Sequence, residues 1–398
     1  MNEMKEIRLP ASKSECNRLM MVAALAGCPL PVFEGECEDI ADMRRCIEQG
    51  IAEGECHIKE SGTALRFLTA LFAVLPPYGK TTVIKCSGRL AQRPLEPLLK
   101  ALVSAGMPQP RVEVDGEGVK SIAVVSSELK GGSLNVSTSE STQYTSALLL
   151  IAPCMENGIS LRLSGGNASS PYIRMTIDLM RRCGARVDTS DSLVRVHSGG
   201  YGTPQTLGSV EADWSAAAFF YEHLTINGGR LLLRGLRMED SLQGDSNAVN
   251  LFLRLGVRSE QTSEGVVIEK TGEASRSIRC DMSATPDLVP PLVAACCFTG
   301  TSFRLEGLGA LRHKESDRIA SVSVAMRAMG HLVEFEKEGC SLCWNGERTL
   351  AAEEKEIEDC GDHRIAMALE AAGKRFHALH PQCVEKSFPE FYKELSKL

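Results

Sequence analysis

The chain has 398 residues, which is enough for two or three domains of ordinary size. Its net charge of −7 and its pI near 5.8 exclude a broad nucleic-acid-binding surface, because such a surface needs a basic face. No apolar run reaches the roughly 18 residues of a membrane-spanning helix, so we expect no contact with a membrane.

The cysteines predict a reducing compartment. Fifteen of them are scattered without the spacing of a disulfide framework, and residues 1–10 lack the apolar segment of a signal peptide. We therefore expect a cytoplasmic protein with free thiols. One CxxC pair, Cys340 and Cys343, has no second ligand pair and lies in a predicted strand, so it does not indicate a metal or redox site.

One local pattern recurs along the chain: an apolar helix ends at a glycine, and a short strand follows. Glycine is favoured there because it adopts the left-handed conformation without a penalty. The pattern predicts helices that end at Gly50, Gly106, Gly184, Gly256, Gly330 and Gly373. Four of these glycines, from 106 to 330, are spaced by 78, 72 and 74 residues. This spacing predicts a repeated α/β unit.

Strands are predicted from period-two or continuous apolar character at 81–86, 159–163, 230–236, 266–270 and 301–308. They come in twos between helices, which differs from the strict alternation of a βαβ protein. Phosphate-loop signatures are missing from the sequence, because Val74 stands where the GKTT of residues 79–82 would need a glycine, and no GxGxxG follows a strand.

Five predicted helices begin in polar clusters, within residues 10–27, 59–73, 137–153, 311–321 and 361–369. Hydroxyl side chains at such places are most often simple N-caps. Four clusters, however, also carry cations within a turn of the helix start: Lys13 and Arg18, Arg66, Lys314 and Arg318, and Arg364. A cation there opposes the helix dipole unless an anion lies between them, so these clusters predict sites for phosphate or carboxylate groups.

The stretch LRHKESDRIAS, residues 311–321, is the most highly charged of these clusters. A solvated helix face is one interpretation. A helix through it would place Lys314 and Arg318 four residues apart, at a cost of about 0.2–0.5 kcal/mol that a bound anion would remove. Glu315 lies beside Lys314, where positive charge tunes a carboxyl pKa, and is a candidate for proton transfer.

Two further residues allow both a chemical and a structural interpretation. His363, next to Arg364, is a candidate for proton transfer, but for this residue taken alone the sequence favours a structural histidine. Asp287 precedes an apolar segment, where an aspartate either caps the helix or takes a proton from a hydroxyl. The sequence alone leaves both alternatives open.

The clusters belong to a longer ordered series of motifs: LPASKSECNR, SGTALRF, QRPLEPLL, STQYTSALL, SPYI, DWSAAAFF, LRHKESDRI, GDHRIAMA and CVEKSFPEFYKEL. In this order, over nearly the whole chain, they resemble the enolpyruvyl transferase family, and KESDR and DHRIAMA are the most specific. The resemblance implies transfer of the enolpyruvyl group of phosphoenolpyruvate to the 5-hydroxyl of shikimate 3-phosphate, by addition and elimination, with release of phosphate. It implies no metal and no organic cofactor.

The resemblance also assigns the site residues. Shikimate 3-phosphate would be bound by Lys13, Ser14, Arg18, Ser141, Thr142, Gln143, Ser169, Tyr172, Asp287 and Lys314. Phosphoenolpyruvate would be bound by Lys13, Gly62, Arg66, Arg93, Gln143, Arg318, Arg364 and Lys386. The catalytic residues would be Lys13, Asp287, Glu315 and His363. In this scheme Glu315 exchanges a proton at the methylene carbon, and Asp287 accepts the proton of the 5-hydroxyl.

The fold that the resemblance implies is α/β, with two similar lobes that each contain three βαβαββ units in an inside-out α/β barrel. The lobes would comprise residues 14–210, and residues 1–13 with 211–398, with the active site in the cleft between them. Closure of the lobes would bring Lys13, Glu315 and Arg364 together. We expect a monomer that has small-molecule substrates.

The sequence departs from the family pattern at a few positions, where Glu60 and Ser61 replace Asn and Ala, and Ala310 replaces an Asn. The sister enzyme that acts on UDP-N-acetylglucosamine is disfavoured, because its reactive loop cysteine is missing from SGRLAQRP, and Cys86 lies at the end of the preceding strand. An inactive relative that serves as a binding module is also disfavoured, because Lys13, Asp287 and Glu315 are all present.

Overall fold

The computed structural model describes residues 4–137, 142–164, 170–202, 210–336, 340–352, 356–373 and 375–398. Its internal contacts divide the chain into two compact units of similar size. Unit 1 comprises Met1–Ser12 with Glu211–Leu398, and unit 2 comprises Lys13–Val210. Within the described ranges, no helix is both long enough and apolar enough to cross a membrane.

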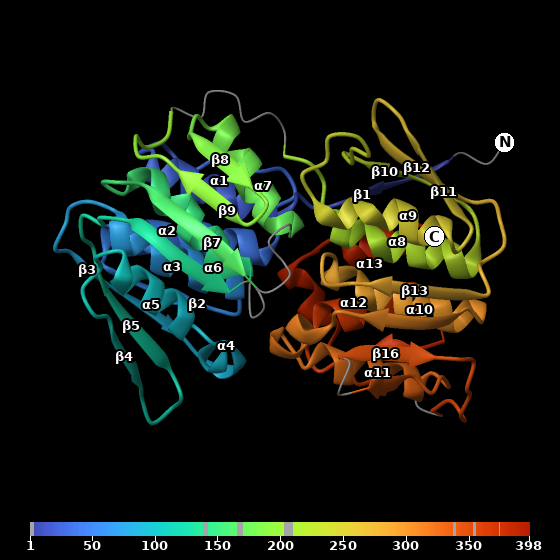
Figure 1. Cartoon of the computed structure of the whole chain (residues 1–398). Helices are drawn as coiled ribbons and strands as arrows, with labels where there is room; N and C mark the ends of the chain where they lie inside the picture. The colour runs from blue at the N-terminus through green and yellow to red at the C-terminus, as the bar shows by residue number, and fades with distance from the viewer. Residues whose placement is uncertain are drawn as a thin grey trace. The chain divides into compact units, whose positions relative to one another are not determined.

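Unit 2 is built from two four-stranded sheets and the helices that cover them (Figure 1). Its elements are α1 Lys13–Leu25, α2 Glu38–Ala52, β2 Glu55–Ile58, α3 Gly62–Val74, β3 Thr81–Cys86, α4 Gly88–Gln92, α5 Glu96–Ser104, β4 Arg111–Val114, β5 Lys120–Val125, β6 Gly132–Ser137, α6 Thr142–Ile151, β7 Ile159–Ser164, α7 Pro171–Arg182, β8 Val187–Ser190 and β9 Leu193–Val196. The strand orders are β2-β3-β5-β4 and β6-β7-β9-β8. In each sheet the first two strands are parallel and the others antiparallel, which is the pattern of a βαβαββ unit.

Unit 1 repeats this arrangement. Its elements are β1 Lys5–Arg8, α8 Trp214–Asn227, β10 Arg230–Arg234, α9 Ala248–Leu253, β11 Val257–Gln261, β12 Gly265–Lys270, β13 Ser277–Asp281, η3 Pro286–Leu288, α10 Val289–Thr299, β14 Ser302–Glu306, η4 Gly309–His313, α11 Arg318–Ala328, β15 Glu334–Glu336, β16 Ser341–Trp344, β17 Glu356–Ile357, α12 His363–Ala371, β18 His377–Ala378, η5 Pro381–Lys386 and α13 Phe391–Leu395. The larger sheets have the orders β1-β10-β12-β11 and β13-β14-β16-β15, and β17 pairs with β18.

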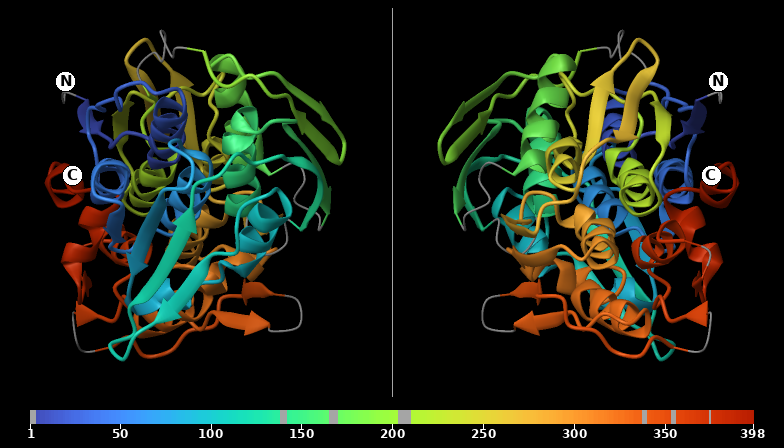
Figure 2. Two further views of the ribbon diagram at one scale, coloured as in Figure 1. Left: turned by 90° about the vertical axis from the view of Figure 1, so that its left-hand side faces the viewer. Right: turned by 90° about the vertical axis from the view of Figure 1, so that its right-hand side faces the viewer.

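The helices form the interior of unit 1, and the sheets form its outer layer. Helices α8 and α10 pack against each other, and both contact α12. Almost every side chain of α10 is buried, whereas β14 alternates between buried and half-exposed residues. A helix that is apolar on all sides belongs inside, and an alternating strand has one solvent-facing side. The first strand and last helix also meet, since the Arg8 amide donates to Glu394 Oε2 at 2.9 Å (Figure 2).

The predicted βαβαββ repeat is confirmed in four complete copies. Gly106, Gly184, Gly256 and Gly330 follow their helices within three residues and have positive φ, as expected. The third unit of each lobe is shorter in the described ranges. The strands β17 and β18 have only two residues each, and α1 and α2 have no four-stranded sheet of their own. The five predicted strands are present as β3, β7, β10, β12 and β14.

Two predictions of local structure were wrong. Helix α2 does not end at Gly50 but continues to Ala52. Glycine stands at position 50 for another reason: α2 packs against the ring of Phe72 there, which leaves no room for a side chain. Residues 314–317 are not helical, so Lys314 and Arg318 are not neighbours on one helix. Helix α11 begins only at Arg318, because the Asp317 carboxylate caps it by accepting from the Ala320 amide at 3.4 Å.

Replacing Gly50 with alanine tests this close packing. A Cβ at position 50 would lie 2.2 Å from Cζ of Phe72, so we expect Gly50→Ala to lower the free energy of unfolding by about 1–3 kcal/mol through overpacking. The measurement is urea-induced unfolding. Gly116→Ala is the control, because nothing lies within 4 Å of its added Cβ and its φ is not positive. Equal stability of the two variants would contradict the packing described.

Candidate active site

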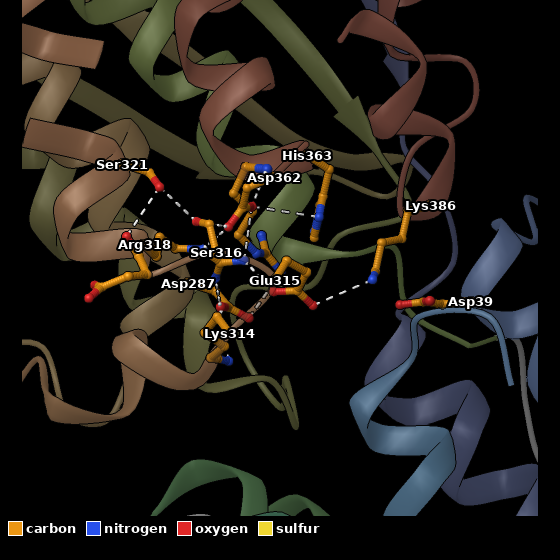
Figure 3. Close-up of polar contacts among 12 residues, drawn as sticks. Asp39, Asp287, Lys314, Glu315, Ser316, Arg318, Ser321, Asp362, His363 and Lys386 are labelled. Carbon is orange, nitrogen blue, oxygen red and sulfur yellow. Dashed lines mark hydrogen bonds and ion pairs between the residues drawn. The ribbon is translucent and has the colours of Figure 1, made fainter. Parts of the chain in front are cut away.

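A compact cluster of acidic and basic side chains lies in unit 1, and Arg318 is at its centre (Figure 3). Arg318 is the first residue of α11, and only 1% of its side chain is exposed. Its Nη1 donates to Asp287 Oδ1 at 2.9 Å, and its Nη2 donates to Glu315 Oε2 at 2.7 Å. Arg318 also forms a bidentate interaction with Asp362, in which Nε donates to Oδ2 at 2.9 Å and Nη2 donates to Oδ1 at 3.1 Å. One guanidinium therefore holds three carboxylates.

Asp287 collects three cations from three different segments. Besides Arg318, it accepts from Arg364 Nη2 at 3.0 Å and from Lys314 Nζ at 3.4 Å. Burial would raise the pKa of Asp287, but the positive charges of Arg364, Lys314 and Arg318 outweigh it and hold this pKa well below its usual range. Asp287 lies in η3, and no side-chain cap is formed there, so its carboxylate serves the cluster and not a helix start.

Glu315 connects the cluster to a second lysine. Its Oε2 accepts from Arg318, and its Oε1 lies 3.7 Å from Nζ of Lys386 at the end of η5. The Lys386 side chain is almost fully buried, and the Glu315 side chain is mostly buried. The residues predicted from the sequence in this half of the chain, Asp287, Lys314, Glu315, Arg318, Arg364 and Lys386, are therefore brought together.

Asp362 is a member of this cluster that sequence reasoning missed. It is fully buried and caps α12 by accepting from the Arg364 amide at 3.0 Å, while it also pairs with Arg318. Ser316 Oγ donates to its Oδ2 at 3.0 Å. An aspartate directly before a predicted helix is a recognisable N-cap signal.

Burial and neighbouring charges shift the pKa values of the buried groups in this cluster in opposite directions. Burial would lower the pKa of Arg318, but Asp362, Glu315 and Asp287 raise it above its usual value, so the guanidinium stays charged. Nearby Asp245, whose carboxylate accepts from Ser215, behaves in the opposite way. Burial and the charge of Asp287 raise the pKa of Asp245 to about 7. His363 is buried on the first turn of α12, with Nδ1 3.8 Å from Asp362 Oδ1.

The predicted cations of unit 2 form a separate set of contacts. Arg18 on α1 is buried, and Nε donates to Thr176 Oγ1 at 2.8 Å, while Nη2 donates to Ser146 Oγ at 3.2 Å. Its Nη groups also reach the backbone carbonyls of Ser14, at 2.8 Å, and Tyr172, at 3.3 Å. Burial lowers the pKa of Arg18 to about 10. The residue is still charged at neutral pH, and the four hydrogen-bond acceptors named here are neutral groups.

Lys13, the first residue of α1, forms an ion pair within unit 2. Its Nζ lies 2.8 Å from Oδ2 of Asp39, a buried carboxylate in the first turn of α2. The helix dipole also favours an anion at that place. Sequence reasoning did not select Asp39, although an acidic residue at a helix start is a recognisable signal.

Two arginines, Arg66 and Arg93, contact Gly62, the first residue of α3. A Cβ added to Gly62 would lie 2.3 Å from Nη1 of Arg93, so the guanidinium of Arg93 rests directly on the bare backbone of Gly62. Arg66 donates to the Gly62 carbonyl at 3.0 Å, and burial together with the charge of Arg93 lowers its pKa to about 10. Two cations this close leave a region of positive potential.

The remaining predicted residues of unit 2 are placed as follows. Gln143 Nε2 donates to Thr63 Oγ1 at 3.0 Å, which joins the start of α6 to the start of α3. Thr142 is the first residue of α6. Ser141 and Ser169 lie outside the described residues. Ser61, one of the departures from the family pattern, caps α3 by accepting from the Ala64 amide at 3.3 Å.

Removing the charge of Asp362 tests the cluster's contribution to stability. We expect Asp362→Asn to lower the free energy of unfolding by up to about 3 kcal/mol, because the change leaves Arg318 buried with one anion fewer. The amide can still cap α12. Asp317→Asn is the matched control, since Asp317 also caps a helix but is more exposed, and we expect a change below about 0.5 kcal/mol. Equal effects in chemical unfolding would refute the charge argument.

Comparison with known proteins identifies the family of the chain. A family model described as EPSP synthase (3-phosphoshikimate 1-carboxyvinyltransferase) matches residues 34–395. The chain is 35% identical over 399 residues to the 3-phosphoshikimate 1-carboxyvinyltransferase of Bacteroides fragilis, which covers 98% of this chain and 94% of that protein. It is 29% identical over 429 residues to the protein of the same name from Methanospirillum hungatei, again with 98% and 94% coverage.

Solved structures show the same fold. EPSP synthase from Acinetobacter baumannii matches with a TM-score of 0.71 at 20% identity and covers 99% of this chain and 96% of that one. The enolpyruvyl transferase NikO from Streptomyces tendae matches with a TM-score of 0.65 at 14% identity, with 100% and 95% coverage. The predicted α/β fold class is therefore confirmed. On these grounds the chain belongs to the EPSP synthase family, the 3-phosphoshikimate 1-carboxyvinyltransferases.

Proposed function

We propose that the protein transfers the enolpyruvyl group of phosphoenolpyruvate to the 5-hydroxyl of shikimate 3-phosphate. The observation that carries this proposal is the set of four cations, Lys314, Arg318, Arg364 and Lys386, gathered around the two carboxylates of Asp287 and Glu315. Both substrates are polyanions, and a preorganised group of cations in a buried site stabilises such charge without reorganisation. Membership of the family supports the same reaction.

In the proposed binding scheme, the carboxylate and phosphate of phosphoenolpyruvate interact with Arg318, Arg364 and Lys386 in unit 1, and with Arg66 and Arg93 in unit 2. Shikimate 3-phosphate is bound through Arg18, Lys13 and Lys314, together with the polar residues named from the sequence. Every one of these cations is a plausible phosphate or carboxylate ligand, because charge-assisted hydrogen bonds to anions are the strongest that side chains form. The proposal also places the active site in a cleft between the two lobes.

The pKa of Asp287 constrains its proposed role as the base. A carboxylate whose pKa is held well below its usual range accepts a proton poorly while Arg318, Arg364 and Lys314 remain paired with it. Substrate anions that draw these cations away would restore its basicity. Asp287 therefore acts as a base only in the loaded site, which ties deprotonation of the 5-hydroxyl to the presence of phosphoenolpyruvate.

Glu315 is the proposed proton donor and acceptor at the methylene carbon, and His363 supports the site from the first turn of α12. Glu315 lies between Arg318 and Lys386, so its carboxylate is directed by two cations and is mostly shielded from bulk water. A carboxyl group held in this way delivers a proton in a fixed direction.

The proposal includes a cytoplasmic location and a monomeric state. The location is supported by the fifteen cysteines, which are all free thiols. Sedimentation of the purified chain would test the monomeric state.

Release of phosphate from phosphoenolpyruvate tests the reaction. We expect release that depends strictly on shikimate 3-phosphate, because the acceptor hydroxyl must attack before phosphate can leave. UDP-N-acetylglucosamine is the control acceptor, and we expect no release with it. Cys86 is buried and burial raises its pKa, so it does not provide the exposed reactive thiol of that sister activity. Release with UDP-N-acetylglucosamine but not with shikimate 3-phosphate would refute the proposal.

Glu315→Gln tests the proton-transfer role. We expect turnover to fall by about 10²–10⁴-fold, the usual contribution of a general acid or base, while binding of shikimate 3-phosphate is largely retained. The measurement is steady-state kinetics combined with calorimetric binding. Glu334→Gln on the exposed face of β15 is the control and should leave turnover unchanged. Unchanged turnover in the Glu315 variant would remove this residue from the mechanism.

A further inference from the structure

A second cluster of ligand-type side chains lies outside the proposed active site, at the turn that follows β17 and at the start of η5. One ligand atom each from Glu358, Asp359 and His380 lies within 4.8 Å of the other two. The proposed reaction uses none of these three residues. The combination of two carboxylates and an imidazole is the kind of ligand set that divalent transition metals prefer.

The distances between these atoms are close to those between the ligands of a metal ion. His380 Nδ1 lies 2.9 Å from Asp359 Oδ1 and 3.7 Å from Glu358 Oε1. Two ligands on a tetrahedral zinc ion, each bound at about 2.0–2.2 Å, are separated by roughly 3.4 Å. The two distances from His380 lie on either side of this value, so each would change by about half an ångström or less around one ion, and the two carboxylate oxygens lie within 4.8 Å of each other.

Both carboxylates are already oriented by the backbone. Asp359 accepts from the Gly361 amide at 2.7 Å and from the His380 amide at 2.6 Å, and Glu358 accepts from the Cys360 amide at 2.6 Å. Cys360 and Gly361 both have positive φ, which closes the turn that directs these amides inward. Outer hydrogen bonds of this kind fix the orientation of metal ligands and strengthen binding.

The cluster is also accessible to an ion. The Asp359 side chain is fully buried, but 48% of the Glu358 side chain and 42% of the His380 side chain are exposed. The carboxylate of Asp359 therefore lies on the buried side of the cluster, and the side chains of Glu358 and His380 lie on its solvent-exposed side. Water can complete the coordination from the open side.

The cluster lies close in sequence to residues of the proposed active site. Asp359 lies three residues before Asp362, which pairs with Arg318, and His380 lies six residues before Lys386, which pairs with Glu315. The β17–β18 pair holds the two segments side by side. A bound ion would therefore cross-link the segment that carries Asp362 and Arg364 to the segment that carries Lys386.

We propose that Glu358, Asp359 and His380 form a binding site for a divalent transition-metal ion, such as Zn²⁺, that cross-links these two segments. The ion replaces the hydrogen bond between His380 Nδ1 and Asp359. A neutral imidazole then carries its single proton on Nε2, whereas an imidazolium releases its Nδ1 proton to solvent when the metal binds. The site takes no part in the chemistry of the proposed reaction. Its existence therefore does not depend on the identity of the substrates.

Zinc titration of the whole purified chain tests this proposal. Calorimetry in the presence of a non-chelating reductant should show one saturable site, and Zn²⁺ should raise the thermal unfolding midpoint of the chain through preferential binding to the folded state. In His380→Gln the affinity should fall at least about tenfold, and the rise in midpoint should disappear. Glu358→Gln provides a second variant at an exposed position, in case His380→Gln folds poorly.

Two matched controls separate this site from other ligands. His377→Gln removes a neighbouring exposed histidine, whose Nδ1 lies 3.2 Å from Glu370, and should leave zinc affinity unchanged. Cys360→Ser removes the exposed thiol of the same turn and should also retain binding. The proposal is wrong if no saturable binding occurs. It is also wrong if Cys360→Ser abolishes binding that both His380→Gln and Glu358→Gln retain.

Discussion

The candidate active site in unit 1 depends on the burial of one guanidinium. Arg318 begins α11, is almost completely shielded from water, and is satisfied by carboxylates from η3, from the segment before α11 and from the cap of α12. A buried cation of this kind is costly unless its partners are fixed, so its presence determines where Asp287, Glu315 and Asp362 must lie. The same carboxylates then position Lys314, Arg364 and Lys386.

Much of the fold could be predicted because its signals are local. Glycines such as Gly184 and Gly330 have the positive φ that ends a helix, and the alternation in β3 and β7 is strong enough to be recognised without tertiary information. The prediction that a helix ends at Gly50 was wrong, because nothing in the local sequence shows that α2 packs closely against Phe72 at this position. Phe72 lies 22 positions further along the chain. Strands of two residues, such as β17, carry too little pattern to be recognised at all.

The cationic side chains of the candidate site could be predicted from the sequence more completely than its carboxylates. The motifs select Lys13, Arg18, Arg318 and Arg364, and all four are at helix starts or one turn inside them, as the sequence predicted. The structure adds that Lys13 pairs with Asp39 and that Arg318 pairs with Asp362, contacts that join residues 26 and 44 positions apart. Such pairs depend on tertiary packing. In both pairs, the partner of the cation is a carboxylate of the chain itself.

Strand β1 has a consequence for how the chain reaches its native state. Residues 5–8 pair in parallel with residues 231–234, and all of unit 2 is inserted between these partners. During synthesis the first strand therefore leaves the ribosome long before the strand it must join. Unit 2 has its own sheets and can become compact in the interval, which shortens the effective loop that β1 must close. β1 is thus made before unit 2 but can form its parallel pair only after residues 231–234 have been synthesised.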